Sequence, residues 1–214
     1  MKRLDLRMVF GIVLVVAGVL FMLQTLGVLK GVESLFFAVL FAAAGAAFLY
    51  WFSQDRKQWW ALIPGFTLLG LAAVIAIEGL FRGRAGGLAG GVFLASIGLG
   101  FLAVYLVKRD FWWALIPAGV MITLGLVATL GDSVGDASGG VFFLGLAATF
   151  GVLYFIPTKQ GPQKWAAIPA LILAALGLLL LLESVANLSF ILPAALIVVG
   201  AYLLWRALVS GKKA

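Results

Sequence analysis

The polar side chains that could do chemistry in this chain recur at one position of its predicted odd-numbered membrane helices. Glu78 and Glu183 each follow a proline, Pro64 or Pro169, by fourteen residues. The full set is Gln24, Glu78, Asp132 and Glu183. Carboxylate and amide oxygens bind hard cations and the basic groups of partners, so the set predicts a polar cluster at the outer helix ends. The alternative is that each side chain is solvated separately at the headgroup level.

The residue types on which most catalysts and cofactors depend are missing, because the sequence has no cysteine and no histidine. This excludes disulfides, thiolate chemistry, the usual zinc and haem sites and histidine acid–base catalysis. The segment 131–140 holds Asp132 and Asp136 but lacks the closing glutamate of a calcium loop. We expect this segment to be a flexible outer turn. We also expect a protein that is no enzyme and holds no cofactor and no metal.

The elements that must position the polar residues are membrane-spanning helices. Of the 214 residues, 64% are hydrophobic and 11% are charged, whereas soluble domains have about 45–50% apolar and about 25% charged residues. A helix needs roughly 20 apolar residues to cross a bilayer. Eight segments approach that length, at about 8–28, 35–52, 60–80, 88–107, 112–131, 139–157, 165–184 and 189–208. Their unbroken apolar runs predict helices rather than barrel strands.

Basic residues give these helices a direction. With the N-terminus in the cytoplasm, twelve Lys and Arg fall in inner segments and three, Lys30, Arg82 and Arg84, fall in outer ones. Cytoplasmic loops carry the excess of positive charge, so we expect both termini in the cytoplasm. The net charge of +7 is spread singly or in pairs between apolar runs. That pattern indicates topology signals and no binding of nucleic acid.

Aromatic residues gather on one predicted side of the membrane. All seven Trp and all four Tyr fall at predicted cytoplasmic helix ends, and both residue types favour the membrane–water interface. We predict cytoplasmic interface anchors at the starts of the odd-numbered helices, namely Trp59, Trp60, Pro64, Trp112, Trp113, Pro117, Trp165 and Pro169. The prolines either begin the regular helices or kink them one turn inside. A docking surface for a partner on this side is the alternative to simple anchoring.

A short phrase repeats along the chain. Residues 59–64 and 112–117 both read Trp-Trp-Ala-Leu-Ile-Pro, and residues 165–169 read Trp-Ala-Ala-Ile-Pro, with shifts of 53 and then 52 residues. We therefore predict an all-α integral membrane fold of eight transmembrane helices, arranged as four tandem parallel-repeat helical hairpins. The hairpins form a single membrane domain over 1–214, with units at about 1–54, 55–108, 109–160 and 161–214. Gly87 and Gly91 are spaced for close helix packing, which we expect to occur inside the chain.

The first predicted hairpin resembles a known family. Residues 11–27, Gly-Ile-Val-Leu-Val-Val-Ala-Gly-Val-Leu-Phe-Met-Leu-Gln-Thr-Leu-Gly, resemble the two-span modules of LiaI/LiaF-type bacterial envelope-stress proteins. The Trp-Trp-Ala-Leu-Ile-Pro phrase looks like one in multi-span bacterial proteins of the same kind. The resemblance implies a bacterial cytoplasmic membrane and a scaffolding or regulatory role. Residues 210–214 stand where LiaF has a soluble domain, so a sensing role of that domain is not implied.

These features predict a non-enzymatic scaffold, accessory or regulatory subunit that lies in the lipid bilayer. Its partners are other membrane proteins or further copies of the chain, and the resemblance implies a relation to envelope stress. The alternative is a small transporter or channel with a polar outer mouth. The mid-span polar residues available to it are uncharged, namely Thr67, Ser96, Thr123 and Thr149. Such residues give little basis for coupling to ions or protons.

Overall fold

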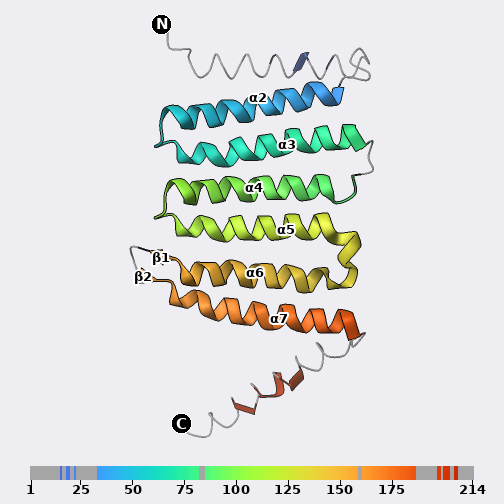
Figure 1. Cartoon of the computed structure of the whole chain (residues 1–214), viewed down its shortest axis with the longest axis vertical. Helices are drawn as coiled ribbons and strands as arrows, with labels where there is room; N and C mark the ends of the chain where they lie inside the picture. The colour runs from blue at the N-terminus through green and yellow to red at the C-terminus, as the bar shows by residue number, and fades with distance from the viewer. Residues whose placement is uncertain are drawn as a thin grey trace.

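In a computed structural model, the chain forms long apolar helices (Figure 1). The structure describes residues 15, 18, 19, 22, 33–81, 85–158, 161–186, 197, 198, 200–202, 205 and 206. Its helices are α2 (Glu33–Gln54), α3 (Leu62–Phe81), α4 (Leu88–Val107), α5 (Leu115–Val134), α6 (Ser138–Phe155) and α7 (Ala167–Ala186). All six are long and apolar enough to cross a membrane, which confirms a multi-pass helical membrane protein. The predicted spans 8–28 and 189–208 lie largely outside the described residues.

The helices α2 to α7 lie side by side in one row, in chain order and with alternating direction (Figure 1). Extensive contacts join only consecutive helices. They are most extensive within the pairs α2–α3, α4–α5 and α6–α7, and least extensive between α5 and α6. Only 11% to 28% of the residues in each span are buried. Each helix therefore leaves two broad apolar sides to its surroundings.

Glycines allow close backbone approach within all three of these pairs, and in the first a Cβ on Gly45 of α2 would lie 2.9 Å from the carbonyl oxygen of Gly65 on α3. A Cβ on Gly91 of α4 would lie 2.6 Å from the carbonyl oxygen of Gly125 on α5. A Cβ on Gly140 of α6 would lie 3.0 Å from the carbonyl oxygen of Gly177 on α7. Close backbone approach is how helices pack in lipid, where no hydrophobic drive brings them together. The expectation that the spaced glycines serve packing inside the chain is confirmed for Gly91.

The row has two different edges. We call one the aromatic edge, because it carries Trp59, Trp60, Trp112, Trp113 and Trp165 beside the connections after α2, α4 and α6. The first two connections cover four residues each, 55–58 and 108–111, and the third covers eight, 156–163. The third contains the antiparallel pair β1 (Pro157–Thr158) and β2 (Gly161–Pro162). The largest fully buried side chains, Val104 and Leu153, belong to helix ends at this edge, so the core is concentrated there.

The expectation of a flexible turn over 131–140 is wrong for most of that segment. Helix α5 continues to Val134, and the 3-10 helix Gly135–Ala137 leads directly into α6. The break is confined to Gly135, whose φ is +49°. Glycine adopts positive φ without steric cost. A single glycine and one short 3-10 helix are thus enough to reverse the chain.

Candidate functional site

The repeated phrase takes one local structure wherever it opens a helix. The 3-10 helices Trp59–Ala61, Trp112–Ala114 and Lys164–Ala166 precede α3, α5 and α7. In each, the alanine N–H donates to the carbonyl of the residue before the turn, at 2.9 to 3.0 Å. The three alanines Ala61, Ala114 and Ala166 are completely buried. The alanine of the phrase is therefore a packing residue, because a larger side chain has no room there.

The prolines of the phrase lie in the first turn of their helices. Pro64, Pro117 and Pro169 are each the third residue of the α-helix, in α3, α5 and α7. The first four backbone N–H groups of an α-helix have no acceptor within it, so a proline there costs no hydrogen bond. The prolines thus lie in the first turn of the regular α-helices, as the first of the two alternatives predicts.

The second tryptophan of each phrase packs on a phenylalanine of the preceding helix. All three contacts are edge-to-face with an interplanar angle of 76°, and the ring centroids are 6.0 to 6.4 Å apart. The pairs are Phe48–Trp60, Phe101–Trp113 and Phe150–Trp165. The indole N–H groups of Trp60 and Trp165 also donate to the Oε1 atoms of Gln58 and Gln163, each at 2.7 Å. These contacts lie within one helix pair.

The first tryptophan of a phrase contacts the next helix pair instead. The ring centroid of Trp59 lies 6.4 Å from that of Trp113, and the centroid of Trp112 lies 6.2 Å from that of Trp165. The third phrase has Lys164 in this place. The contacts join α2–α3 to α4–α5, and α4–α5 to α6–α7. We call the whole series the aromatic ladder, made of Phe48, Trp59, Trp60, Phe101, Phe111, Trp112, Trp113, Phe150 and Trp165.

Cations lie over aromatic rings along the same edge. The guanidinium of Arg56 stands 5.0 Å from the centroid of Phe52, and that of Arg109 stands 4.8 Å from Tyr105. Lys108 Nζ lies 5.7 Å from the ring of Trp59, which belongs to the preceding helix pair. Cation–π contacts contribute about 0.5–1 kcal/mol at exposed sites. Positive charge is therefore fixed beside the aromatic ladder.

The tryptophans of the ladder serve packing but are not fully enclosed. Trp60, Trp113 and Trp165 keep 41%, 39% and 46% of their surface exposed. Anchoring at the membrane interface stays a prediction, and the structure adds that the same side chains link helix pairs. The sequence reading missed this linking role. The recurrence of phenylalanine at positions 48, 101 and 150 is a signal for the contacts within the helix pairs only.

The predicted outer polar set lies partly within the described residues. Gln24 is outside them, and so is the side chain of Asp132, whose backbone belongs to α5. Glu78 is exposed near the end of α3 and Glu183 is half-buried near the end of α7, at the edge opposite the aromatic edge. Helices α4, α5 and α6 lie between them, so the structure does not bring these two carboxylates together. Within the described ranges, no group of three or more acidic residues could hold a metal ion.

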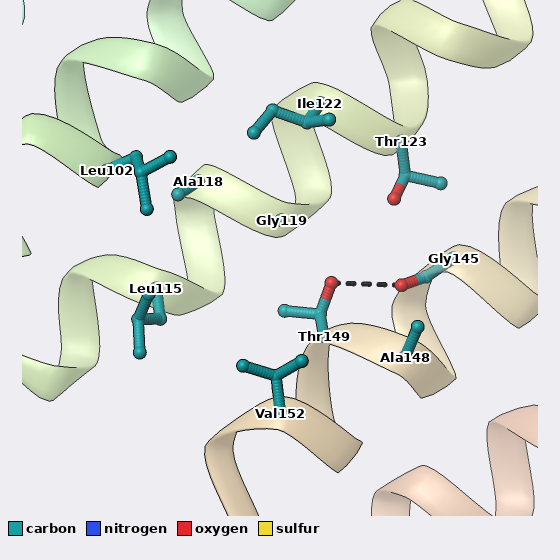
Figure 2. Close-up of a pocket in the computed structure, with 10 residues that line it drawn as sticks. All are labelled: Leu102, Leu115, Ala118, Gly119, Ile122, Thr123, Gly145, Ala148, Thr149 and Val152. Atoms are coloured by element: carbon teal, nitrogen blue, oxygen red, sulfur yellow. Dashed lines mark hydrogen bonds between the residues drawn. The ribbon is translucent and has the colours of Figure 1, made fainter. Parts of the chain in front are cut away.

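A groove of about 240 Å³ lies along the contact of α5 with α6 (Figure 2). Each helix sets a threonine against a glycine of the other: Thr123 of α5 lies over Gly145, and Thr149 of α6 lies over Gly119. Leu102 of α4 completes one wall. The lining is otherwise aliphatic, so the groove is an apolar space with two hydroxyl groups beside it.

No protein-family model, no curated protein and no solved structure matches this chain. Its function therefore has to be derived from the geometry of the chain itself.

Proposed function

We propose that this chain is a non-enzymatic scaffold or accessory subunit of a membrane, which binds other membrane proteins or further copies of itself. The observation that supports the proposal is the single row of helices. Because extensive contacts among the described helices join only consecutive ones, no described helix covers either broad side of the row. A compact bundle of the same helices would bury much of this surface in its own core.

The exposed side chains on the row are suited to helix packing. Ile122, Leu126 and Leu130 follow one another at four-residue spacing on α5, and all three are exposed. Lipid tails are as apolar as these side chains, so helices associate in a bilayer through van der Waals packing and occasional hydrogen bonds. A flat row of repeated units provides an extended binding surface, as solenoid proteins do in water. The aromatic ladder supports this role because it holds the helix pairs in fixed register.

The proposal includes the finer features predicted from the sequence. It places eight helices in four tandem hairpins, with both termini and the aromatic edge in the cytoplasm. It places the protein in the bacterial cytoplasmic membrane, with a relation to envelope stress through the resemblance to LiaI/LiaF-type proteins. The cations at the aromatic edge, Arg56, Lys108 and Arg109, support the orientation, because basic residues favour the cytoplasmic side.

Native mass spectrometry after extraction in mild detergent tests the scaffold role. The expected mass exceeds the 22.6 kDa of the chain by one or more whole subunits. A photo-crosslinking amino acid at Leu126, which is half-exposed, is expected to capture the same subunit. The same probe at Leu153, which is fully buried, serves as the matched control and is expected to capture none. A monomer without partners, crosslinked only to lipid, would contradict the proposal.

Three of the four mid-span hydroxyls give no support to a small transporter or channel. Thr67, Ser96 and Thr149 donate to carbonyls of their own helices, at 2.6 to 2.9 Å. Hydroxyls bonded in this way do not form a polar path through the described helices. Substrate or ion flux in proteoliposomes would nevertheless establish the transporter function in place of the scaffold.

A further inference from the structure

We propose that the groove between α5 and α6 binds a membrane-soluble cyclic compound with a carbonyl or hydroxyl oxygen, the chemical class of the quinones and phenols. The hydroxyl of Thr123 forms a hydrogen bond with that oxygen, and the aliphatic walls hold the ring. The proposal does not rest on the partner binding proposed above, although Ile122 belongs to both surfaces.

Thr123 differs from the other hydroxyl residues of the membrane helices. Five of them donate to a carbonyl of their own helix at 2.6 to 2.9 Å, namely Thr67, Ser96, Thr129, Thr149 and Ser184. The hydroxyl of Thr123 makes no such bond among the described residues, and although the residue is only 7% exposed, its oxygen is not enclosed, since no fully buried side-chain oxygen there lacks a partner. Figure 2 shows its oxygen turned toward α6 and the groove. A hydroxyl in apolar surroundings is unfavourable without a partner, so a ligand oxygen is stabilised there.

Helix α5 has a glycine, Gly119, where α3 has a phenylalanine, and the smaller side chain of Thr149 lies over it. Between α3 and α4, Phe66 packs against Gly100, and a Cβ on Gly100 would lie 3.2 Å from the Cβ of Phe66. The 53-residue shift places Gly119 in the position of Phe66. The groove beside Gly119 measures about 240 Å³, and an apolar cavity of about 150 Å³ accepts benzene. The groove is therefore large enough for a substituted ring.

The depth of the groove limits which oxygen atoms can reach Thr123. Thr123 lies eight residues beyond Leu115, about 12 Å along the helix, and thus near the middle of a hydrocarbon core about 30 Å thick. Phospholipid ester oxygens lie at the headgroup level, and acyl chains carry no oxygen at this depth. A membrane-soluble ring that carries its own oxygen can bring that oxygen to this depth.

Equilibrium binding of tritiated decylubiquinone to the full chain in nanodiscs tests the proposal, with empty nanodiscs subtracted. The expected result is saturable binding to one site per chain. Decylbenzene, which lacks the oxygens, is expected to compete about 2- to 12-fold less well, the ratio that one net hydrogen bond gives. Thr123→Val keeps the shape and removes the hydroxyl, so it is expected to raise the Kd by a similar factor.

A second variant tests the position of the site. Ala148 is exposed and lines the groove, so Ala148→Phe is expected to abolish saturable binding. Ala175→Phe changes an equally exposed alanine on α7 and is the matched control, with unchanged binding. If Ala148→Phe does not elute as a folded species in size exclusion, Thr123→Val and decylbenzene decide the question.

Three results would overturn the proposal. They are the absence of binding above empty nanodiscs, equal competition by decylbenzene, and unchanged binding in Thr123→Val. If the two groove variants instead abolish association with a membrane protein while decylubiquinone does not bind, the groove holds a partner side chain and the proposal is wrong. Because the quinone assay uses the purified chain alone, its outcome is separate from that of the scaffold role.

Discussion

The rings of Trp59 and Trp113 stand 6.4 Å apart at an interplanar angle of 74°, although the two residues open different helices. Trp112 and Trp165 stand in a similar relation, at 6.2 Å and 61°. Each contact crosses from one helix pair to the next. The aromatic ladder thus fixes the positions of consecutive pairs at the edge where the core is concentrated.

The substitution Trp59→Ala is expected to lower the free energy of unfolding by about 1–3 kcal/mol, because it removes buried surface and two aromatic contacts. Titration with a denaturing detergent in mixed micelles measures this change. Trp51→Ala is the control, since Trp51 is 49% exposed and contacts Trp60 alone among the described ladder residues. The control is expected to cost less than about 1 kcal/mol. An equal loss of unfolding free energy in both variants would show that the contacts between helix pairs do not contribute to stability.

The neighbouring glycines Gly90 and Gly91 are expected to respond oppositely to alanine. A Cβ on Gly91 would meet the backbone of Gly125, whereas a Cβ on Gly90 would meet nothing within 4 Å. Gly91→Ala is therefore expected to destabilise the protein by about 1–3 kcal/mol through overpacking. Gly90→Ala is expected to be neutral or to stabilise by up to about 1 kcal/mol through helix propensity. Thermal unfolding in detergent measures both, and a destabilised Gly90→Ala would contradict the packing shown by the structure.

The orientation can be measured directly because the chain has no native cysteine. Single cysteines at Gln58 and at Lys164 belong to the aromatic edge, and single cysteines at Ala85 and at Asp136 belong to the opposite edge. In intact cells, a membrane-impermeant maleimide is expected to label only the Cys variants of Ala85 and Asp136. After permeabilisation, all four are expected to react. The reverse pattern would place the aromatic edge outside the cell.

The carboxylates Glu78 and Glu183 are expected to act independently. Their helices are separated by α4, α5 and α6, and distant sites without shared partners add within about 0.3–0.5 kcal/mol. The effects of Glu78→Gln and Glu183→Gln on unfolding are therefore expected to sum in the double variant. Recovery of partners from membranes is measured on the same variants. A loss found only in the double variant would indicate a joint site formed between copies of the chain.

The six described spans could be predicted because length and hydropathy are sufficient in a bilayer. The single row could not be predicted, because side chains that face lipid and side chains that face another helix are equally apolar. Hydropathy therefore gives the helices but not their neighbours. The turn after α5 was predicted to be too long, for a different reason. Glycine, serine and aspartate favour loops in general, yet here one positive φ at Gly135 was sufficient to reverse the chain.

The candidate sites also divide into features that the sequence predicts and features that depend on packing. The repeat correctly drew attention to Trp59, Trp60 and their counterparts, because a phrase of six residues is easily detected. It also suggested that Glu78 and Glu183 lie together, but equivalent positions in a tandem row are displaced from each other by whole helix pairs. The groove could not be found from the sequence, because the direction of the Thr123 hydroxyl depends on packing.

The contacts between consecutive helices also bear on how the protein folds during its synthesis. Among the described residues, extensive contacts between helices join each helix to the one before or after it in sequence, and contacts between sequence neighbours favour fast folding. Chains emerge at about 5–20 residues per second and fold from the N-terminal side. The pair α2–α3 can therefore complete its packing before α5 has been synthesised. Assembly of this membrane protein can follow the order of its own translation, one helix after another.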